Sequence, residues 1–229
     1  MDFLLEALML FSDLVKNHCF PPDWLQMILI ENREILKTLR FMSETIKENL
    51  SGNDFQFEVW NTFFHTGIAF ITQKPLQLEA FSENKRSFIL TRFKDMRREC
   101  GMEVRSMWFR LNASFQRRFI PSLVGPMLQM TLIPDRTLRL ETIPIFFAMM
   151  EAEYYSDAAA AALGFDDESS RFSNTSSTTG RNSAAAVDRK GSFTQFEHEL
   201  IKQLDAQFDA GHGDITIFLT ASRFYFLMF

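Results

Sequence analysis

The chain has 229 residues, of which 46% are hydrophobic and 23% charged, with a formal net charge of −5 at pH 7. This length and composition fit one large or two small globular domains. The negative charge argues against a general nucleic-acid binder, which would normally be basic. Twenty-six Phe against nine Gly favour large helical packing surfaces over a sheet with many hairpins.

The cysteines and histidines predict no metal or disulfide chemistry. Cys19 and Cys100 are the two cysteines, too few for a disulfide framework, and we expect them to be reduced in a cytoplasmic protein. The four histidines show no ligand spacing, so we predict no metal site and no cofactor. No phosphate loop, zinc-protease or nucleophile-elbow motif occurs, and we predict no catalytic residue.

Helical periodicity dominates residues 2 to 155. In the first stretch, apolar residues recur at steps of three and four without a preceding basic segment, which indicates an amphipathic helix rather than a signal peptide. Its apolar face would be Phe3, Leu4, Ala7, Leu8, Phe11, Leu14 and Val15. After Pro21 and Pro22, a second helix would bury Trp24, Met27, Ile28, Ile35, Leu39, Met42 and Ile46.

Further helices follow at short intervals. One would hold "FEVWNTFFHTGIAFITQ", and another would run from about Ser82 through "NKRSFILTRFKDM" to a break at Gly101. We place Pro121, Pro126 and Pro134 in first turns or kinks. Short links force antiparallel neighbours. We therefore predict an all-α fold of antiparallel helix pairs over 1–155, an armadillo- or HEAT-like solenoid segment, with an irregular bundle as the alternative because no sequence repeat is visible.

Residues 156–191 differ in composition. They are rich in Ser, Thr, Ala and Asn, bury too little to offset the entropy of ordering, and are predicted to form a disordered insertion. A helix is expected over 192–214, opened by a capping box of Ser192 with Gln195 or of Thr194 with Glu197. Its apolar stripe would be Phe196, Leu200, Ile201, Leu204 and Phe208.

The segment "RKGS" at 189–192 resembles a target of basophilic kinases and makes Ser192 a candidate phosphosite. A phosphate there would face a helix N-terminus, where the helix dipole favours negative charge. Short motifs of this kind also arise by chance, and that is the alternative interpretation.

Three other features have a functional and a structural interpretation. The basic stretch 85–118 could bind an acidic partner or anionic lipid, but a solvated helix face with local ion pairs, such as that of Asp95 with Arg98, is favoured. His65 lies in an apolar stretch and is expected to be a core or interface histidine. Cys100 lies next in sequence to arginines that could lower its pKa, yet no nucleophile arrangement accompanies it.

Long segments resemble the dedicator-of-cytokinesis (DOCK) family, in the subgroups that act on Rac. They follow one another in family order and cover most of 55–155 and 193–214. The segments are "EVWNTFFHTGIAFITQKPLQLEAFSENKRSFIL", "DMRRECGMEVRSMWFRL", "RFIPSLVGPMLQMTLIP", "TIPIFFAMMEAEY" and "FEHELIKQLDAQFDAGHGD". The first fifty residues are similar in helical pattern and in "PPDW".

The resemblance implies a large multidomain guanine-nucleotide exchange factor for Rac or Cdc42. Such proteins have a lipid-binding C2-type domain, an armadillo-like helical region and a catalytic DOCKER domain. On this resemblance, 1–155 corresponds to the end of the armadillo-like region and 192–214 to a helix at the start of the DOCKER domain. The stretch 156–191 is longer than the family's usual link and would be an insertion.

The apolar tail 215–229 departs from the family, which would continue into another amphipathic helix. A membrane anchor needs about 20 apolar residues, and this tail is shorter and contains Arg223. A strand at a sheet edge would need a sheet that nothing predicts. We favour an end unrelated to the family, from an alternative transcript, a retained intron or an erroneous gene model, and expect no membrane span.

Taken with the resemblance, these features predict a fragment of an exchange factor for Rac-class small GTPases. It would supply helical scaffold, lack the catalytic lobes and have no exchange activity alone. The alternative is a freestanding helical interaction module, a truncated form that pairs with a full-length partner through its helical surfaces. No nucleic-acid partner is expected.

Overall fold

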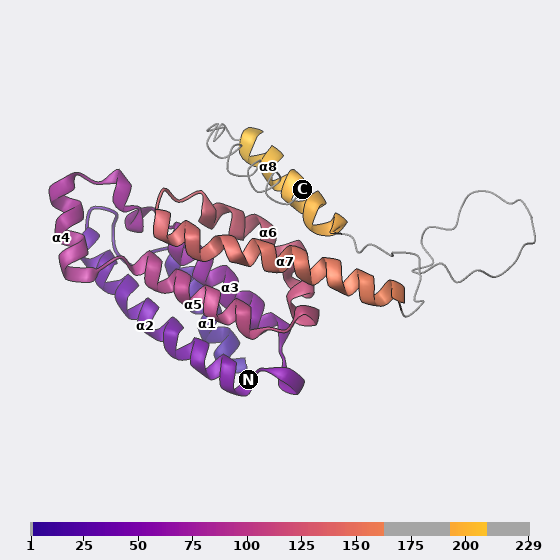
Figure 1. Cartoon of the computed structure of the whole chain (residues 1–229). Helices are drawn as coiled ribbons and strands as arrows, with labels where there is room; N and C mark the ends of the chain where they lie inside the picture. The colour runs from indigo at the N-terminus through magenta and orange to yellow at the C-terminus, as the bar shows by residue number, and fades with distance from the viewer. Residues whose placement is uncertain (1, 163–192, 210–229) are drawn as a thin grey trace, which may run out of the picture.

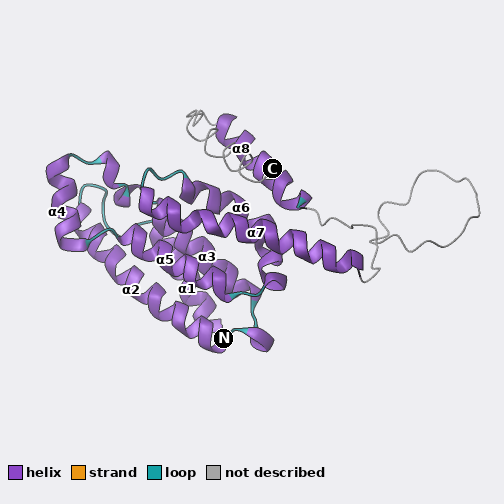
Figure 2. Cartoon of the chain, in the orientation of Figure 1, coloured by secondary structure: helices purple, strands orange, loops and turns teal. Residues whose placement is uncertain are grey.

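The computed structural model describes residues 2–162 and 193–209 (Figure 1). In these two ranges every regular element is a helix, which confirms the all-α prediction (Figure 2). The α-helices are α1 (Asp2–Lys16), α2 (Leu25–Asn49), α3 (Phe57–Thr72), α4 (Glu83–Phe93), α5 (Met96–Arg110), α6 (Ala113–Thr131), α7 (Arg136–Ala162) and α8 (Thr194–Asp209). The short 3-10 helices are η1 (Gly52–Asp54), η2 (Lys74–Leu76) and η3 (Leu78–Ala80). None of these helices is long and apolar enough to cross a bilayer.

The long helices alternate between two layers. One layer contains α2, α5 and α7, each packed on the next, and the other contains α1, α3, α6 and α8. Across the layers α3 packs on α5 and, most extensively, α6 packs on α7. This alternation is the stacked-pair arrangement predicted for an α-solenoid. The short helix α4 lies beside the start of α2, at one side of the array (Figure 1).

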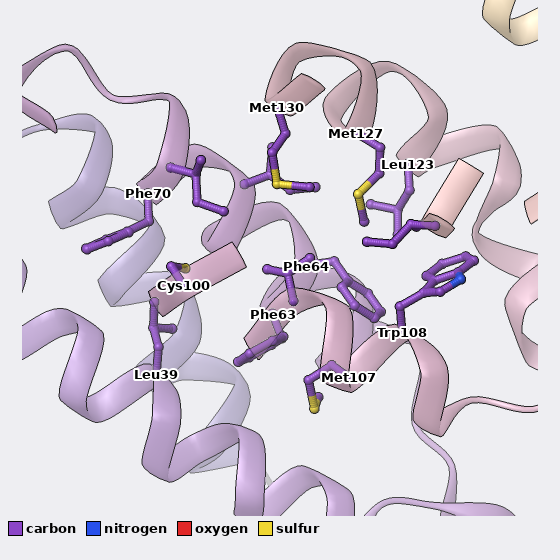
Figure 3. Packing of buried hydrophobic residues seen from close by; sticks show 14 of the residues in the cluster. Leu39, Phe63, Phe64, Phe70, Cys100, Met107, Trp108, Leu123, Met127 and Met130 are labelled. Carbon is purple, nitrogen blue, oxygen red and sulfur yellow. The ribbon is translucent and has the colours of Figure 1, made fainter. Parts of the chain in front are cut away.

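A continuous apolar core joins the two layers. Phe64 of α3 points toward Trp108 of α5, and Met127 of α6 belongs to the same buried cluster (Figure 3). The rings of Phe64 and Trp108 meet edge to face with centroids 5.8 Å apart, and Phe119 lies 5.5 Å from Phe64. Such pairs add to the free energy gained by burial alone.

The predicted break at Gly101 is wrong. Gly101 lies inside α5 and is buried against α7. A Cβ at this position would lie 2.5 Å from the side chain of Leu138 of α7, which leaves no room for a larger residue. The chain instead breaks at Lys94, whose φ of 61° ends α4 before Asp95 caps α5. Glycine serves here for close helix approach, not for a turn.

Two of the prolines lie inside a helix. Pro121 and Pro126 are inside α6, so the first-turn alternative is wrong for them, and a kink at these positions stays a prediction. A proline within a helix removes a backbone hydrogen bond. The helix continues because its buried face packs against the rest of the core, through Phe119, Ile120, Leu123, Val124 and Met127.

The buried stripes were mostly predicted correctly, with exceptions near the starts of α1 and α2 and in the middle of α8. Phe3, Trp24, Met27 and Ile201 are exposed rather than buried. The helix α7 runs to Ala162, so the beginning of the predicted insertion 156–191 is helical. The rest of that insertion, the tail 215–229 and the side chain of Phe208 lie outside the described residues.

Candidate functional site

The basic stretch 85–118 is the largest charged feature that the sequence singled out, and its arginines are largely engaged within the fold. Arg86 donates through Nε to the carbonyl of Leu78 at 3.0 Å and through its terminal nitrogen to that of Phe81 at 3.3 Å. It thereby fixes the turn between η3 and α4. The guanidinium of Arg118 lies over the rings of Phe55 and Phe57, at 5.6 and 5.2 Å from their centroids.

Arg97 is the centre of a buried charged cluster at the start of α5. Its side chain is 1% exposed and donates to both carboxylate oxygens of Asp95 at 3.0 Å, and to those of Glu79 at 2.7 and 3.0 Å. A further bond reaches Oε1 of Gln77 at 3.3 Å. Burial opposes the charge, but these bonds outweigh it and raise the pKa of Arg97. The hydrogen bond from Arg97 lowers the pKa of Glu79.

Asp135 joins α5 to the start of α7. It accepts from Nε of Arg98 at 3.2 Å and from the backbone N–H of Leu138 at 2.8 Å, so it caps α7 while pairing with α5. Burial would raise the pKa of Asp135, but the bonds from Arg98 and Leu138 lower it. The predicted pair of Asp95 with Arg98 is present at 3.5 Å.

Ion pairs tie α5 to both of its neighbours in the layer. Glu103 lies 3.5 Å from Arg40 and 3.6 Å from Lys47 of α2, and it accepts from the hydroxyl of Ser43 at 3.0 Å. On the other side Arg105 pairs with Glu141 of α7. We call these inter-helix pairs, together with the Arg97 and Asp135 contacts, the charged seam. The favoured interpretation of 85–118 as a solvated helix face with local ion pairs therefore holds only in part, because Arg97 is buried and most of these pairs join different helices.

The candidate reactive side chains lie apart. His65 is half-buried, and burial, then the charge of Lys16, lower its pKa. Cys100 is buried, with its thiol 3.5 Å from the carbonyl of Gly67. Burial raises the pKa of Cys100, the opposite of the lowering that nearby arginines could have caused. Within 2–162 and 193–209 no group of His, Cys, Asp and Glu could hold a metal ion.

A groove that the sequence did not predict lies between the start of α2 and α4. It has a volume of about 450 Å³, and its lining includes the apolar Trp24, Met27 and Phe88 and the charged Asp23 and Lys85. The three apolar side chains are 58%, 38% and 43% exposed. Periodicity assigned Trp24 and Met27 to the buried stripe because it counts spacing from inside the helix. It cannot tell that Trp24 and Met27, at the start of α2, stay exposed among the described residues.

The contact between α7 and α8 is also absent from the sequence prediction. The two predicted capping boxes stay predictions, because Ser192 lies outside the described residues and the backbone bond of Glu197 does not decide the second. The N–H of Gln195 donates to Glu153 of α7, and that of Glu197 donates to the carbonyl of Phe193. Ser192 lies outside the described residues, so its phosphorylation stays a prediction.

Comparison with known proteins gives a consistent result. A family model described as "Dedicator of cytokinesis (DOCK) TPR region" matches residues 1–163. The chain is 34% identical over 215 residues to human dedicator of cytokinesis protein 4, and 33% identical over 213 residues to mouse dedicator of cytokinesis protein 3. The alignments cover 94% and 93% of this chain and 9% of each relative. The chain therefore spans less than a tenth of the length of these relatives.

Proposed function

The chain belongs to the dedicator of cytokinesis family, and on this basis we propose that it is a helical scaffold segment of a guanine-nucleotide exchange factor for Rac-class small GTPases, acting in the cytoplasm. The observation that carries the proposal is the charged seam. Three arginines of the basic stretch that could have met a GTPase or a membrane instead pair within the fold: Arg97 with Glu79 of η3, Arg98 with Asp135 at the start of α7, and Arg105 with Glu141 of α7. Helices held together in this way can support a catalytic region and fix its orientation.

In this scaffold role the chain supports a catalytic region without catalysing nucleotide exchange itself. We propose that these 229 residues do not accelerate nucleotide release by themselves, and that 1–155 and the α8 segment serve the armadillo-like region and the start of the DOCKER domain. In a test with Rac loaded with fluorescent GDP, the purified chain should leave the rate of nucleotide release at its intrinsic value. Acceleration that scales with the concentration of the chain would contradict this.

A chimera tests the support itself. The matching segment of a family member that is active in exchange would be replaced by this chain, and the exchange activity should persist. The same chimera with Arg97→Met should lose stability and activity together, because Asp95 and Glu79 are left without their buried partner. Lys37→Met is the matched control, since Lys37 pairs with Glu34 on an exposed surface. Full activity of the Arg97→Met chimera would count against a scaffold role.

The groove at α2 and α4 favours a second candidate, a helical interaction module that pairs with a full-length partner or with itself. Exposed Trp and Phe side chains in a concave surface are typical of binding sites. Replacing Trp24 and Phe88 by Ser should then abolish any concentration-dependent association in analytical ultracentrifugation. An unchanged sedimentation profile would exclude the groove as the interface.

A further inference from the structure

The helix α8 is fixed to the preceding helices by a cap that is distant in sequence. Glu153 of α7 is 2% exposed, and its two carboxylate oxygens accept from the backbone N–H groups of Gln195 at 2.7 Å and Phe196 at 2.8 Å. The first N–H groups of a helix have no partner within the helix. A carboxylate is favoured there by the helix dipole as well as by the bonds themselves.

A cap that comes from a distant helix differs from a local one, because it acts only while the two helices are in contact. A Ser or Thr at the N-cap would satisfy the first turn wherever the helix went. Glu153 can satisfy it only while α8 lies on α7. An isolated helix as short as the 16 residues of α8 is marginally stable in water.

The apolar side of α8 depends on the same placement. Phe196 is buried and meets the ring of Phe146 edge to face, with centroids 6.2 Å apart. Leu200 and Leu204 pack against the core. On α6, Gly125 faces the side chain of Gln203, which would lie 2.6 Å from a Cβ at that position.

We propose that Glu153 is a latch that couples the folding of α8 to its docking on α6 and α7. The latched state is a rigid continuation of the helical array beyond residue 163, where the family match ends. The released state is an unfolded α8, not a detached helix. Release would uncouple helices α1–α7 from the chain that follows α8. The latch would therefore decide whether these two parts move as one rigid body.

Hydrogen–deuterium exchange on the 229-residue chain tests the latch without any GTPase. Glu153→Ala should speed exchange of the α8 amides by tenfold or more, since two charge-assisted bonds are lost, while α3 amides keep their protection. Glu153→Gln should have a smaller effect of the same kind, because its single carbonyl oxygen can still accept. Glu151→Ala is the matched control, an exposed glutamate on the same helix, and should change neither.

A second variant tests the contact of α8 with α6. Gly125→Leu should displace Gln203 and speed exchange of α8 amides with Glu153 intact, while α6 itself exchanges no faster because leucine favours the helix over glycine. The latch is overturned if α8 responds to Glu153→Ala no more than to Glu151→Ala. It is equally overturned if α3 amides accelerate as much as those of α8, which would make Glu153 a general stabiliser.

Discussion

Arg97 shows how a charge can be buried in this fold. With 1% of its side chain exposed, it depends on two carboxylates that would themselves be costly to leave unpaired. Replacing such a pair as a whole can be neutral, but removing one partner is strongly destabilising. The cluster therefore acts as a unit that joins η3 to the start of α5.

We expect Arg97→Met to lower the free energy of unfolding by about 3–5 kcal/mol. Arg97→Lys should recover little, because an ammonium group cannot donate to two carboxylates in the planar geometry of a guanidinium. Urea denaturation followed by circular dichroism measures both. The exposed control Lys37→Met should change the value by about 0.5 kcal/mol or less. A cost for Arg97→Met no greater than that of the control would mean that the cluster contributes no net stability.

Lys94 is a residue in a strained conformation. Its φ of 61° and ψ of −171° lie in a region that glycine populates far more readily than other residues. Its side chain is exposed, so little packing is lost on replacement. Lys94→Gly should therefore stabilise the protein by about 0.5–2 kcal/mol, the relief of strain outweighing the extra entropy of the unfolded chain. A rise in Tm would be observed by calorimetry. Lys94→Ala is the control and should give no such rise.

At the scale of elements, the helices were easier to predict than their ends. The spacing of apolar residues located α1, α2 and α3 because their buried faces follow the 3.6-residue period. The end of α4 at Lys94 has no such signal, since a lysine with a positive φ is not marked by the local sequence. The start of α8 is served by Glu153, about forty residues earlier, and local capping rules cannot detect a partner so distant.

The same limit applies to the functional features. A run of basic residues was visible, yet only the fold brings Glu79, Asp135 and Glu141 to its arginines. The groove at Trp24 was missed for the reverse reason. Its residues have a core pattern, but within 2–162 and 193–209 they stay exposed.

The link between α5 and α7 should make stability depend on pH. The pKa values of Asp135 and Glu79 are lowered in the folded state, so their contribution is complete above the unfolded values near 4 and is lost as the pH falls. Asp135→Asn should keep the cap on α7, because asparagine also caps well, and lose the pair with Arg98. We expect a cost of about 1–2 kcal/mol at pH 7 and a smaller loss between pH 6 and pH 3 than in the parent. Parallel pH profiles in urea titrations would contradict this assignment.

For the whole molecule, α3 is the central helix. It packs on α1, α2, α5 and α6, whereas α1 lies at the edge of the described array and packs mainly on α3. In stacked helical arrays stability is carried by contacts between neighbours, so the loss of an inner helix removes more interfaces than the loss of an outer one. Truncating a buried apolar side chain should therefore destabilise more of the neighbouring helices when it lies in α3 than when it lies in α1.

Phe64→Ala, in the centre of the core, should cost about 3–5 kcal/mol and speed hydrogen exchange in α3, α5 and α6 together. Leu8→Ala, at an equally buried position of α1, should cost about 2–5 kcal/mol locally and speed exchange in α1 while α6 and α7 keep their protection. Exchange mapped by mass spectrometry at matched pH separates the two patterns. If Leu8→Ala instead accelerated α7 as much as α1, the array would unfold as one cooperative unit. A substitution in α1 would then destabilise every helix of the array.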